Sequence, residues 1–500
     1  MGNVEVHEEE EEEEEEAVSP SSSLMQQPKF NLYILALMGF QTAIDVPLFK
    51  LSLSQTLIHH PRFSSLLVNS NNGARRRMRW KRVRVDVDSH VFAPDLDPEM
   101  DGPDTFVEDF TADLSKTPMD RKKPLWEVYI LNVPTADAAA TAVFKIDHSV
   151  GDGASLISLV LACSRKISDP QALPEMPVQK KPRPLSVAAA GSPAGLRSPG
   201  IVKWALLLTW TLLLTIFHTV ADGVAILATV AFVKDKKTPI KGSAGVEASP
   251  KRFVHRIVSL DDFKLVKTAM NVSINDVALA VTEAGVSRYL KSRYDNVDEN
   301  GASKKKFNVR NGRMRIGIAF NLRPPPTIQD LAKIIKKEKK LDGKWGNQVG
   351  LALIPLNMNL QKDPLSCLNR AKATMERRKL SLSPKLVFIV IKALVKLFGA
   401  ETAAAVTNRV FQNTTLAFSN VVGPQEEICL FGHHLSYIAP TVYGFPQALL
   451  IHYQSYSNKL VIALAADEKL IPNPHCLCDH LQESLQNLKE AVIKRGLVLV

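Results

Sequence analysis

A histidine and an aspartate four residues apart are the side chains of this sequence best suited to acid–base chemistry. His148 and Asp152 lie within residues 144–153, which read FKIDHSVGDG. A neutral imidazole can accept a proton from a hydroxyl group near neutral pH. A carboxylate four residues later can lock the turn that carries the imidazole, through backbone amides or through an arginine. The pattern HxxxDG therefore indicates a general base held in a fixed turn, although a structural histidine gives the same short pattern.

The elements around this turn would position the histidine. Residues Thr141 to Ile146 alternate as in a strand, and Ala154 to Ser164 have helical spacing. Gly151 and Gly153 permit a sharp exit from the strand. The sequence therefore predicts that His148 lies at the end of a strand, directly before a helix.

One chemistry open to these residues is the transfer of an acyl group from a thioester to an alcohol. His148 would take the hydroxyl proton as general base, a hydrogen-bond donor would stabilise the oxyanion, and the imidazolium would protonate the departing thiolate. No GxSxG motif is present, so nothing in the sequence indicates an acyl-enzyme. We expect Asp152 to pair with Arg323 and so, with Gly153, to support the turn. Arg323 could instead cap another loop or bind a phosphate of coenzyme A.

Six further short motifs follow one another along the chain. They are HPRF at 60–63, PLWE at 124–127, NDV at 275–277, NLRP at 321–324, GN at 346–347 and SNVVGP at 419–424. With HxxxDG, they resemble the plant wax ester synthase/diacylglycerol acyltransferase family, a branch of the HxxxD acyl-CoA-dependent acyltransferases. The resemblance runs from about Ser19 to the C-terminus. The family signature is HHxxxDG, so Asp147 stands where the family usually has its first histidine, and His148 matches the histidine proposed as the base.

The resemblance implies an α/β fold of two chloramphenicol-acetyltransferase-like domains, each a mixed sheet with flanking helices, with an active-site tunnel between them. Acyl-CoA would be a co-substrate, with no bound cofactor. The acceptor would be a fatty alcohol, giving wax ester, or diacylglycerol, giving triacylglycerol, and we favour the long-chain alcohol. Neither a metal nor a nucleic-acid partner is expected.

The resemblance also implies substrate contacts at Asn275, Ser419 and Asn420, with Asn275 as a candidate oxyanion donor. Each has a structural alternative. Asn275 could simply cap a helix, with Ser273 as a competing cap, and residues 419–420 could form a plain turn.

The composition agrees with an enzyme that contacts membrane. The net charge is +11 and the isoelectric point is about 9.2, which favours anionic lipid headgroups or the phosphates of coenzyme A, although a merely basic surface is an equal alternative. The N-terminus is acidic where a secretory signal would be basic and apolar, and we expect the five cysteines to be reduced. We therefore expect the catalytic domains to face the cytosol, at the endoplasmic reticulum membrane or the plasma membrane.

Changes of composition divide the chain into four parts. Residues 1–28, with the acidic run Glu8 to Glu16, are predicted to be a disordered tail. Residues 29–185 would form the N-terminal domain, 186–250 a linker and 251–500 the C-terminal domain.

The linker contains an apolar run at 204–233. Trp204 to Ala221 lacks charged residues and is long enough to span a bilayer, but Asp222 interrupts the run and the rest is too short for a second crossing. A single crossing would place the two domains on opposite sides of the membrane. We therefore favour a helix or helical pair that lies in the membrane interface or covers the acyl site, over a spanning helix or a buried core helix.

Two other functions fit parts of the sequence. A soluble HxxxD acyltransferase of phenolic or other specialised acceptors normally carries DFGWG near the C-terminus, and this chain does not. A non-catalytic lipid-binding membrane protein has only Asp147 in its favour. Trp126 is predicted to pack in the core, and His59, His433, His434 and His452, which lie in no motif, are interpreted as structural or surface residues.

Overall fold

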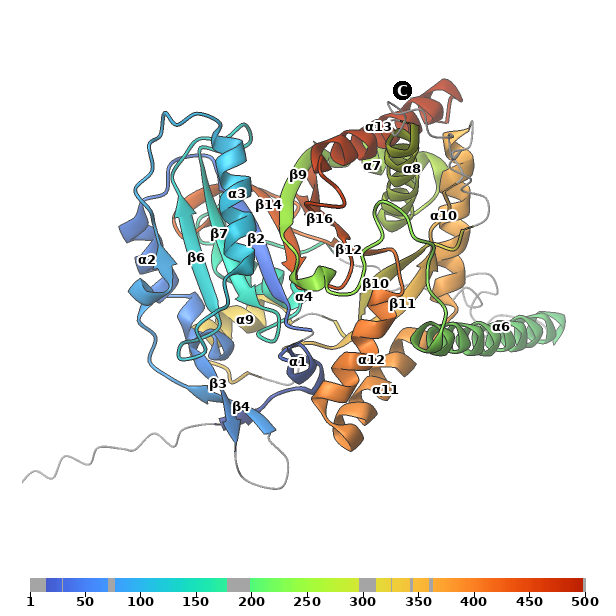
Figure 1. Ribbon diagram of the computed structural model, residues 1–500, viewed down its shortest axis with the longest axis horizontal. Helices are drawn as coiled ribbons and strands as arrows, with labels where there is room; N and C mark the ends of the chain where they lie inside the picture. The colour runs from blue at the N-terminus through green and yellow to red at the C-terminus, as the bar shows by residue number, and fades with distance from the viewer. Residues whose placement is uncertain are drawn as a thin grey trace, which may run out of the picture.

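The described residues form two large mixed β-sheets that lie side by side, each with helices against it, and a small three-stranded sheet (Figure 1). The computed structural model describes all residues except 1–14, 29, 71–76, 178–197, 296–311, 325, 342–344, 359–362 and 498–500. Both sheets contain parallel and antiparallel neighbours. The α/β class and the mixed sheets with flanking helices were predicted, and the structure confirms them.

The N-terminal sheet has seven strands, in the order β5-β6-β7-β2-β14-β13-β8. Their bounds are β2 Tyr33–Phe40, β5 Val91–Phe92, β6 Trp126–Leu131, β7 Ala140–Asp147, β8 Ser164–Lys166, β13 Ile428–Leu430 and β14 His433–Tyr443. The helices of this half are α2 Val46–Ser54, α3 Pro103–Lys116, α4 Gly153–Ala162 and α9 Ile328–Ile335. Every residue of β2 and β7 is buried, as expected for central strands covered on both faces.

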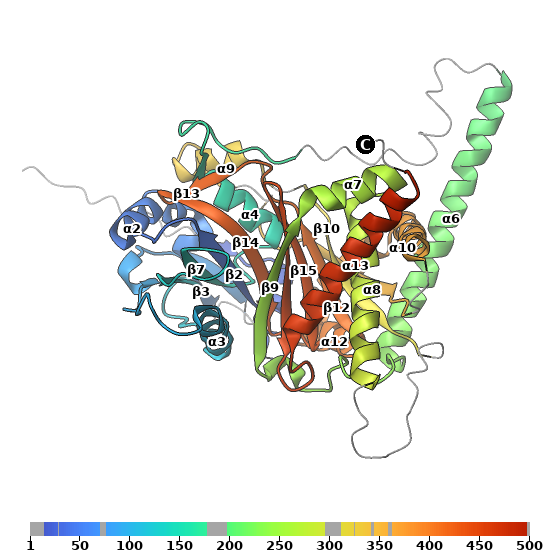
Figure 2. The same ribbon diagram turned by 90° about the horizontal axis from the view of Figure 1, so that it is seen from above.

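The C-terminal sheet has six strands, in the order β11-β10-β12-β15-β16-β9. Their bounds are β9 Lys251–Ser259, β10 Arg315–Asn321, β11 Val349–Pro355, β12 Leu416–Val421, β15 Leu449–Tyr456 and β16 Lys459–Asp467. The helices of this half are α7 Leu260–Met270, α8 Ile274–Asp295, α10 Pro364–Lys379, α11 Ser383–Phe398, α12 Ala400–Gln412 and α13 Pro474–Lys494. One face of this sheet packs against α7, α8, α10 and α13, while the other faces the N-terminal half (Figure 2).

The two halves share strands across the predicted domain boundary. Strands β13 and β14 come from the C-terminal part of the chain but pair inside the N-terminal sheet, β14 directly beside β2. One apolar core also runs from β2 and β7 to Leu450, Val461 and Ala463 on the C-terminal sheet. A boundary at residue 251 therefore does not coincide with the boundary between the two sheets. The sequence could not show this, because a pairing between strands far apart in the chain leaves no local signal.

The predicted disordered tail ends earlier than expected. Residues 1–14 lie outside the described residues, but β1 Glu15–Ala17 pairs with β4 Arg77–Arg82, which in turn pairs with β3 Ser65–Ser70. Glu16 forms an ion pair with Arg62 at 2.5 Å. Helix α1, Pro20–Leu24, follows and reaches the HxxxDG turn. The prediction of disorder over 1–28 was wrong from residue 15 onward, because arginines of the body neutralise the end of the acidic run.

The apolar run of the linker forms one continuous helix, α6 Ser198–Ala231. It is the only helix among the described residues that is long and apolar enough to cross a bilayer, by length and composition. Asp222, the charged residue within the apolar run, does not break the helix. Its carboxylate is buried and forms ion pairs with Arg377 at 3.0 Å and Arg378 at 2.6 Å on α10.

The elements around the HxxxDG turn match the sequence prediction. The strand expected at 141–146 lies within β7, and the helix expected at 154–164 is α4. Helix α2 ends at Ser54 and is followed by two short 3-10 turns.

Candidate active site

His148 follows the last residue of β7, at the seam between the two halves. Its backbone N–H donates to the carbonyl of Leu32 at 2.9 Å, and its own carbonyl accepts from Nδ2 of Asn347 at 2.7 Å. Leu32 precedes β2, whereas Asn347 precedes β11 of the C-terminal sheet. Both halves of the protein therefore fix the backbone that carries the imidazole.

The environment of His148 keeps its ring neutral. Burial lowers the pKa of His148 below its ordinary value, and the carboxylates of Asp152 and Asp147 act in the opposite direction without cancelling the effect. Nδ1 is buried and has no hydrogen-bond partner. A neutral imidazole is the form of histidine that can accept a proton.

Asp152 caps the helix that follows the turn. Its Oδ1 accepts from the backbone N–H of Ser155 at 2.8 Å, which satisfies a free donor at the start of α4. Its Oδ2 lies 3.7 Å from Nη2 of Arg323, and both side chains are buried. The expected pairing of Asp152 with Arg323 is therefore present, through one contact rather than two parallel hydrogen bonds.

Arg323 connects the turn to a second loop of the C-terminal half. Its Nη2 donates to the carbonyl of Gly346 and lies 3.3 Å from Oγ of Ser155. Arg323 follows β10, so this side chain ties the start of α4 to the C-terminal sheet.

The residues Trp345, Gly346 and Asn347 form the other side of the turn. The indole N–H of Trp345 donates to the carbonyl of Val150 at 2.8 Å. A Cβ on Gly151 would lie 3.1 Å from the Trp345 ring, so close packing keeps position 151 small. The sequence singled out GN at 346–347 as a motif without giving it a role, and the structure shows that it holds the backbone around His148.

Asp147 does not orient His148 but stabilises the turn. Its Oδ1 accepts from Ser149 N–H at 2.9 Å, from Ser149 Oγ at 2.6 Å and from Gln26 Nε2 at 2.5 Å. Oγ of Ser22 donates to the carbonyl of Ser149 at 3.0 Å. The segment that was predicted to be disordered therefore supports the turn directly. Burial raises the pKa of Asp147, although its hydrogen bonds from Ser149 and Gln26 oppose this shift.

His452 is a residue of the site that the sequence did not reveal. On β15 it shares a face with Leu450 and Tyr456, which belong to the core next to the N-terminal half, and it is paired in register with Ser419 on β12. Its Nε2 is buried without a hydrogen-bond partner. Burial lowers the pKa of His452 to about 4, and the nearby His148 adds to this shift.

The end of β12 brings Ser419 toward the turn, together with His452, its partner on the neighbouring strand β15. Val421, two residues after Ser419, has its Cγ2 3.6 Å from where a Cβ of Gly153 would stand. Successive residues of a strand alternate in direction, so Ser419 and Val421 point to the same side. His452 lies in no sequence motif, so its approach to the turn was not predicted.

Asn275 and Asn420 form a hydrogen bond with each other. Asn420 directly follows Ser419 on β12, so its side chain points to the opposite face of the sheet. Nδ2 of Asn420 donates to Oδ1 of Asn275 at 2.6 Å, and the pair is solvent-accessible. Ser273 caps α8, because its Oγ accepts from Asp276 N–H at 3.2 Å while the Asp276 carboxylate accepts from Ser273 N–H at 2.7 Å. The capping alternative therefore applies to Ser273 and Asp276, and a substrate contact at Asn275 or Asn420 stays a prediction.

Trp126 lies in the core, as expected. It is buried on β6 beside β7, its indole N–H donates to the carbonyl of Phe63 at 2.9 Å, and its ring stacks on His90 with centroids 4.2 Å apart. His433 is also structural, since Nε2 accepts from the N–H of Asp45 at 2.8 Å.

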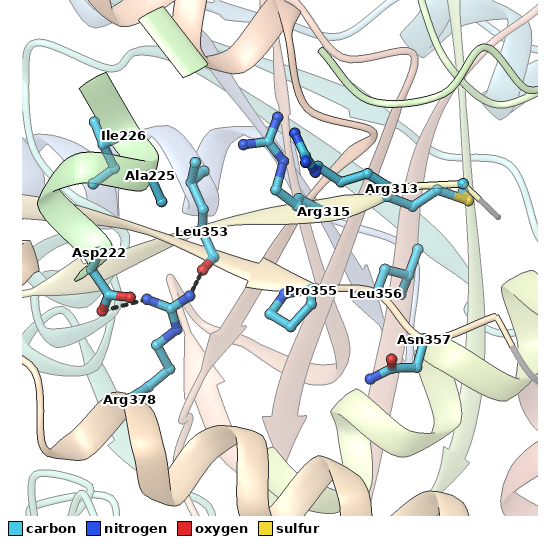
Figure 3. Close-up of a pocket in the computed structure, with 12 residues that line it drawn as sticks. Asp222, Ala225, Ile226, Arg313, Arg315, Leu353, Pro355, Leu356, Asn357 and Arg378 are labelled. Carbon is cyan, nitrogen blue, oxygen red and sulfur yellow. Dashed lines mark hydrogen bonds and ion pairs between the residues drawn. The ribbon is translucent and has the colours of Figure 1, made fainter. Parts of the chain in front are cut away.

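A cavity of about 330 Å³ lies elsewhere, between α6, α10, β10 and β11 (Figure 3). Its charged lining groups are largely committed to partners, since Arg378 binds Asp222 and Arg315 binds Asp235 at 2.6 Å. None of the predicted site residues lines it. The cavity is therefore a gap beneath α6 and no part of the histidine site.

Comparison with known proteins identifies the family. Residues 21–278 match the model of the wax ester synthase/diacylglycerol acyltransferase catalytic domain, and residues 345–489 match the model of the WS/DGAT C-terminal domain. The chain belongs to the wax ester synthase/diacylglycerol acyltransferase family. It is 44% identical over 479 residues to wax ester synthase/diacylglycerol acyltransferase 11 of Arabidopsis thaliana, with 96% of each chain covered. It is 43% identical to number 5 of the same plant, covering 95% of this chain and 94% of that one.

Solved structures show the same fold. The wax ester synthase/diacylglycerol acyltransferase from Marinobacter aquaeolei VT8 matches with a TM-score of 0.57 at 16% identity, covering 95% of this chain and 100% of that one. The starter condensation domain of rhizomide synthetase matches with a TM-score of 0.51 at 13% identity, covering 96% and 94%. The family, the fold class and the assignment to acyl-CoA-dependent O-acyltransferases, all predicted from the motifs, are confirmed.

Proposed function

We propose that this family member transfers a long-chain fatty acyl group from acyl-CoA to a long-chain fatty alcohol, giving wax ester, with diacylglycerol as a second acceptor. The observation that carries the proposal is the neutral, half-buried His148 at the seam of the two sheets, with its backbone held by both halves. Such a position suits a base that two substrates approach from different sides. We also propose that an active-site tunnel runs between the two halves and leads to His148.

His148 acts as the general base. It takes the proton of the acceptor hydroxyl while the oxygen attacks the thioester carbonyl. The tetrahedral intermediate then collapses, the carbon–sulfur bond breaks, and the imidazolium gives its proton to the departing thiolate. The products are an ester and free coenzyme A, so atoms and charge balance without an acyl-enzyme. Asp152 and Arg323 act as positioning residues because they hold the turn and α4.

His452 supplies a hydrogen-bond donor for the oxyanion. Its Nε2 is buried without a partner, and the ring stays neutral because its pKa is about 4. A neutral imidazole N–H can stabilise negative charge without competing with His148 for the proton. Ser419, next to it on β12, is a second donor on the same face.

The protein associates with membrane through α6. Its residues from Val202 onward are apolar and largely exposed, and both proposed acceptors are lipids that dissolve in a bilayer. We propose the endoplasmic reticulum or the plasma membrane as its location, with the catalytic halves in the cytosol.

Radiolabelled palmitoyl-CoA, offered separately with hexadecanol, with diacylglycerol or with a phenolic alcohol, tests the function. We expect labelled wax ester in greater amount than labelled triacylglycerol, and neither from a His148→Gln variant, whose rate should fall by about 10²- to 10⁴-fold. Product from neither lipid acceptor would refute the proposal, and so would product from a phenolic acceptor only.

His452→Leu should lower kcat by about 10²-fold, with KM little changed. A rate equal to wild type would remove His452 from the mechanism.

A further inference from the structure

We propose that α11 lies flat on the membrane as a second lipid contact beside α6, with its lysines at anionic headgroups. This inference rests on the membrane association proposed above and is independent of which acceptor is used. None of the sequence motifs falls on α11.

Helix α11 exposes a continuous apolar stripe. The side chains in it are between 47% and 64% exposed and are Leu382, Leu386, Ile389, Val390, Leu397 and Phe398. Leu382, Leu386 and Ile389 follow one another at spacings of four and three residues, and Val390 and Leu397 lie two turns apart. These spacings place them along one side of an α-helix. Exposed large apolar residues that form one stripe mark a surface for a partner or a membrane.

The opposite side of α11 is already used by the protein. Val387, Ile391, Leu394 and Val395 pack against the core that joins the two sheets. The exposed stripe is therefore an additional apolar surface, not a core face left open by chance.

The charged residues of α11 favour a membrane over a protein partner. Lys385, Lys392 and Lys396 are exposed and lie along one edge of the stripe, and residues 383–398 contain no aspartate or glutamate. Lysines beside an apolar face extend their ammonium groups to headgroup level while their stems follow the apolar surface. This arrangement fits an anionic lipid surface.

The structure also joins α11 to α6. The N–H of Leu382 donates to Oγ1 of Thr219 at 2.9 Å, and Oγ of Ser383 is 3.3 Å from the carboxylate of Asp222. Arg409 on α12 donates to the carbonyls of Val230 and Ala231. The C-terminal half of α6 is therefore fastened to the body, beside the start of α11.

This anchoring decides how α6 meets the bilayer. Residues 198–218 of α6 precede the anchored half, and this part of the helix extends beyond the body (Figure 2). The uncharged apolar stretch within it follows Lys203 and runs only from Trp204 to His218. At about 1.5 Å per residue this stretch reaches about 22 Å, less than the hydrocarbon core of about 30 Å. A helix of this reach lies in the interface more readily than it spans. Helix α11 then adds a second contact on the same body.

Flotation of the purified full-length protein with vesicles tests the inference. The vesicles are phosphatidylcholine alone or phosphatidylcholine with phosphatidylserine. The stripe variant carries Ile389→Ser and Leu397→Ser, and the charge variant carries Lys385→Gln, Lys392→Gln and Lys396→Gln. The matched control is Leu51→Ser, which removes an exposed leucine on α2, far from both helices. Acyl transfer with detergent-dispersed substrates shows that each variant is folded.

We expect the stripe variant to lose at least about tenfold in vesicle partitioning, and the charge variant to lose the preference for phosphatidylserine. The control should bind like wild type, and all should keep the detergent activity. Wild-type binding by both variants would overturn the role of α11 while leaving α6 association intact. Failure of the wild type to float would overturn membrane association itself. A change of oligomeric state in the stripe variant would show that the stripe of α11 contacts a second copy of the chain instead of a membrane, and it would also overturn the inference.

Discussion

Replacing Asp152 with asparagine separates two tasks of one carboxylate. Oδ1 caps α4 and Oδ2 faces Arg323 at 3.7 Å in a buried pair. Asparagine caps helices about as well as aspartate, so Asp152→Asn keeps the cap and removes only the charge. Asp152→Ala removes both.

The size of the effect follows from these contacts. Breaking a buried ion pair from one side typically costs about 3–5 kcal/mol. Arg323 retains the carbonyl of Gly346 and the hydroxyl of Ser155, and the contact at 3.7 Å is long, so about 1–2 kcal/mol is expected here. The alanine variant should lose about 1 kcal/mol more. Because the turn aims His148, kcat of Asp152→Asn should fall by about tenfold or more.

Thermal unfolding and acyl transfer at saturating substrates measure both effects. Asp45→Asn is the matched control, because Asp45 caps α2 through the N–H of Leu48 at 2.9 Å on an exposed surface. The control should leave midpoint and rate unchanged. If Asp152→Asn also kept the wild-type midpoint and rate, the pairing with Arg323 would be irrelevant and the reasoning refuted.

Two further predictions concern the same turn. The acid limb of the rate profile should lie below pH 6.5, because burial keeps the folded-state pKa of His148 below its ordinary value and a protonated imidazole cannot act as the base. The unfolded chain binds more protons in acid than the folded chain, so stability falls in the same direction. A rate profile whose acid limb lies above pH 6.5 would contradict this. Asp147→His, which introduces the histidine usual in the family, should destabilise the protein by about 2 kcal/mol, because the contacts with Ser149 and Gln26 are lost at a buried position. Asp147→Asn should remain close to wild type in thermal unfolding, and an equally stable histidine variant would show that these contacts are dispensable.

The sequence alone determined the family and the fold class, and it predicted His148 as the base. Seven short motifs in order identified the acyltransferases, and the strand–turn–helix around His148 was readable because strand alternation, glycines and helical spacing are local patterns. The expected partner of Asp152 was also found, since the loop after a strand is where such an arginine can reach a turn. These predictions needed only neighbouring residues or a family pattern.

Only the tertiary structure decided which distant residues meet. The place of β14 in the N-terminal sheet, the contact of Gln26 with Asp147 and the approach of His452 to His148 join segments far apart in the chain. Asp222 was read as a break in the apolar run because its arginine partners lie more than 150 positions away on α10. A residue's own type gives its charge and polarity, but its partners depend on how the sheets pair and pack, which no local pattern records.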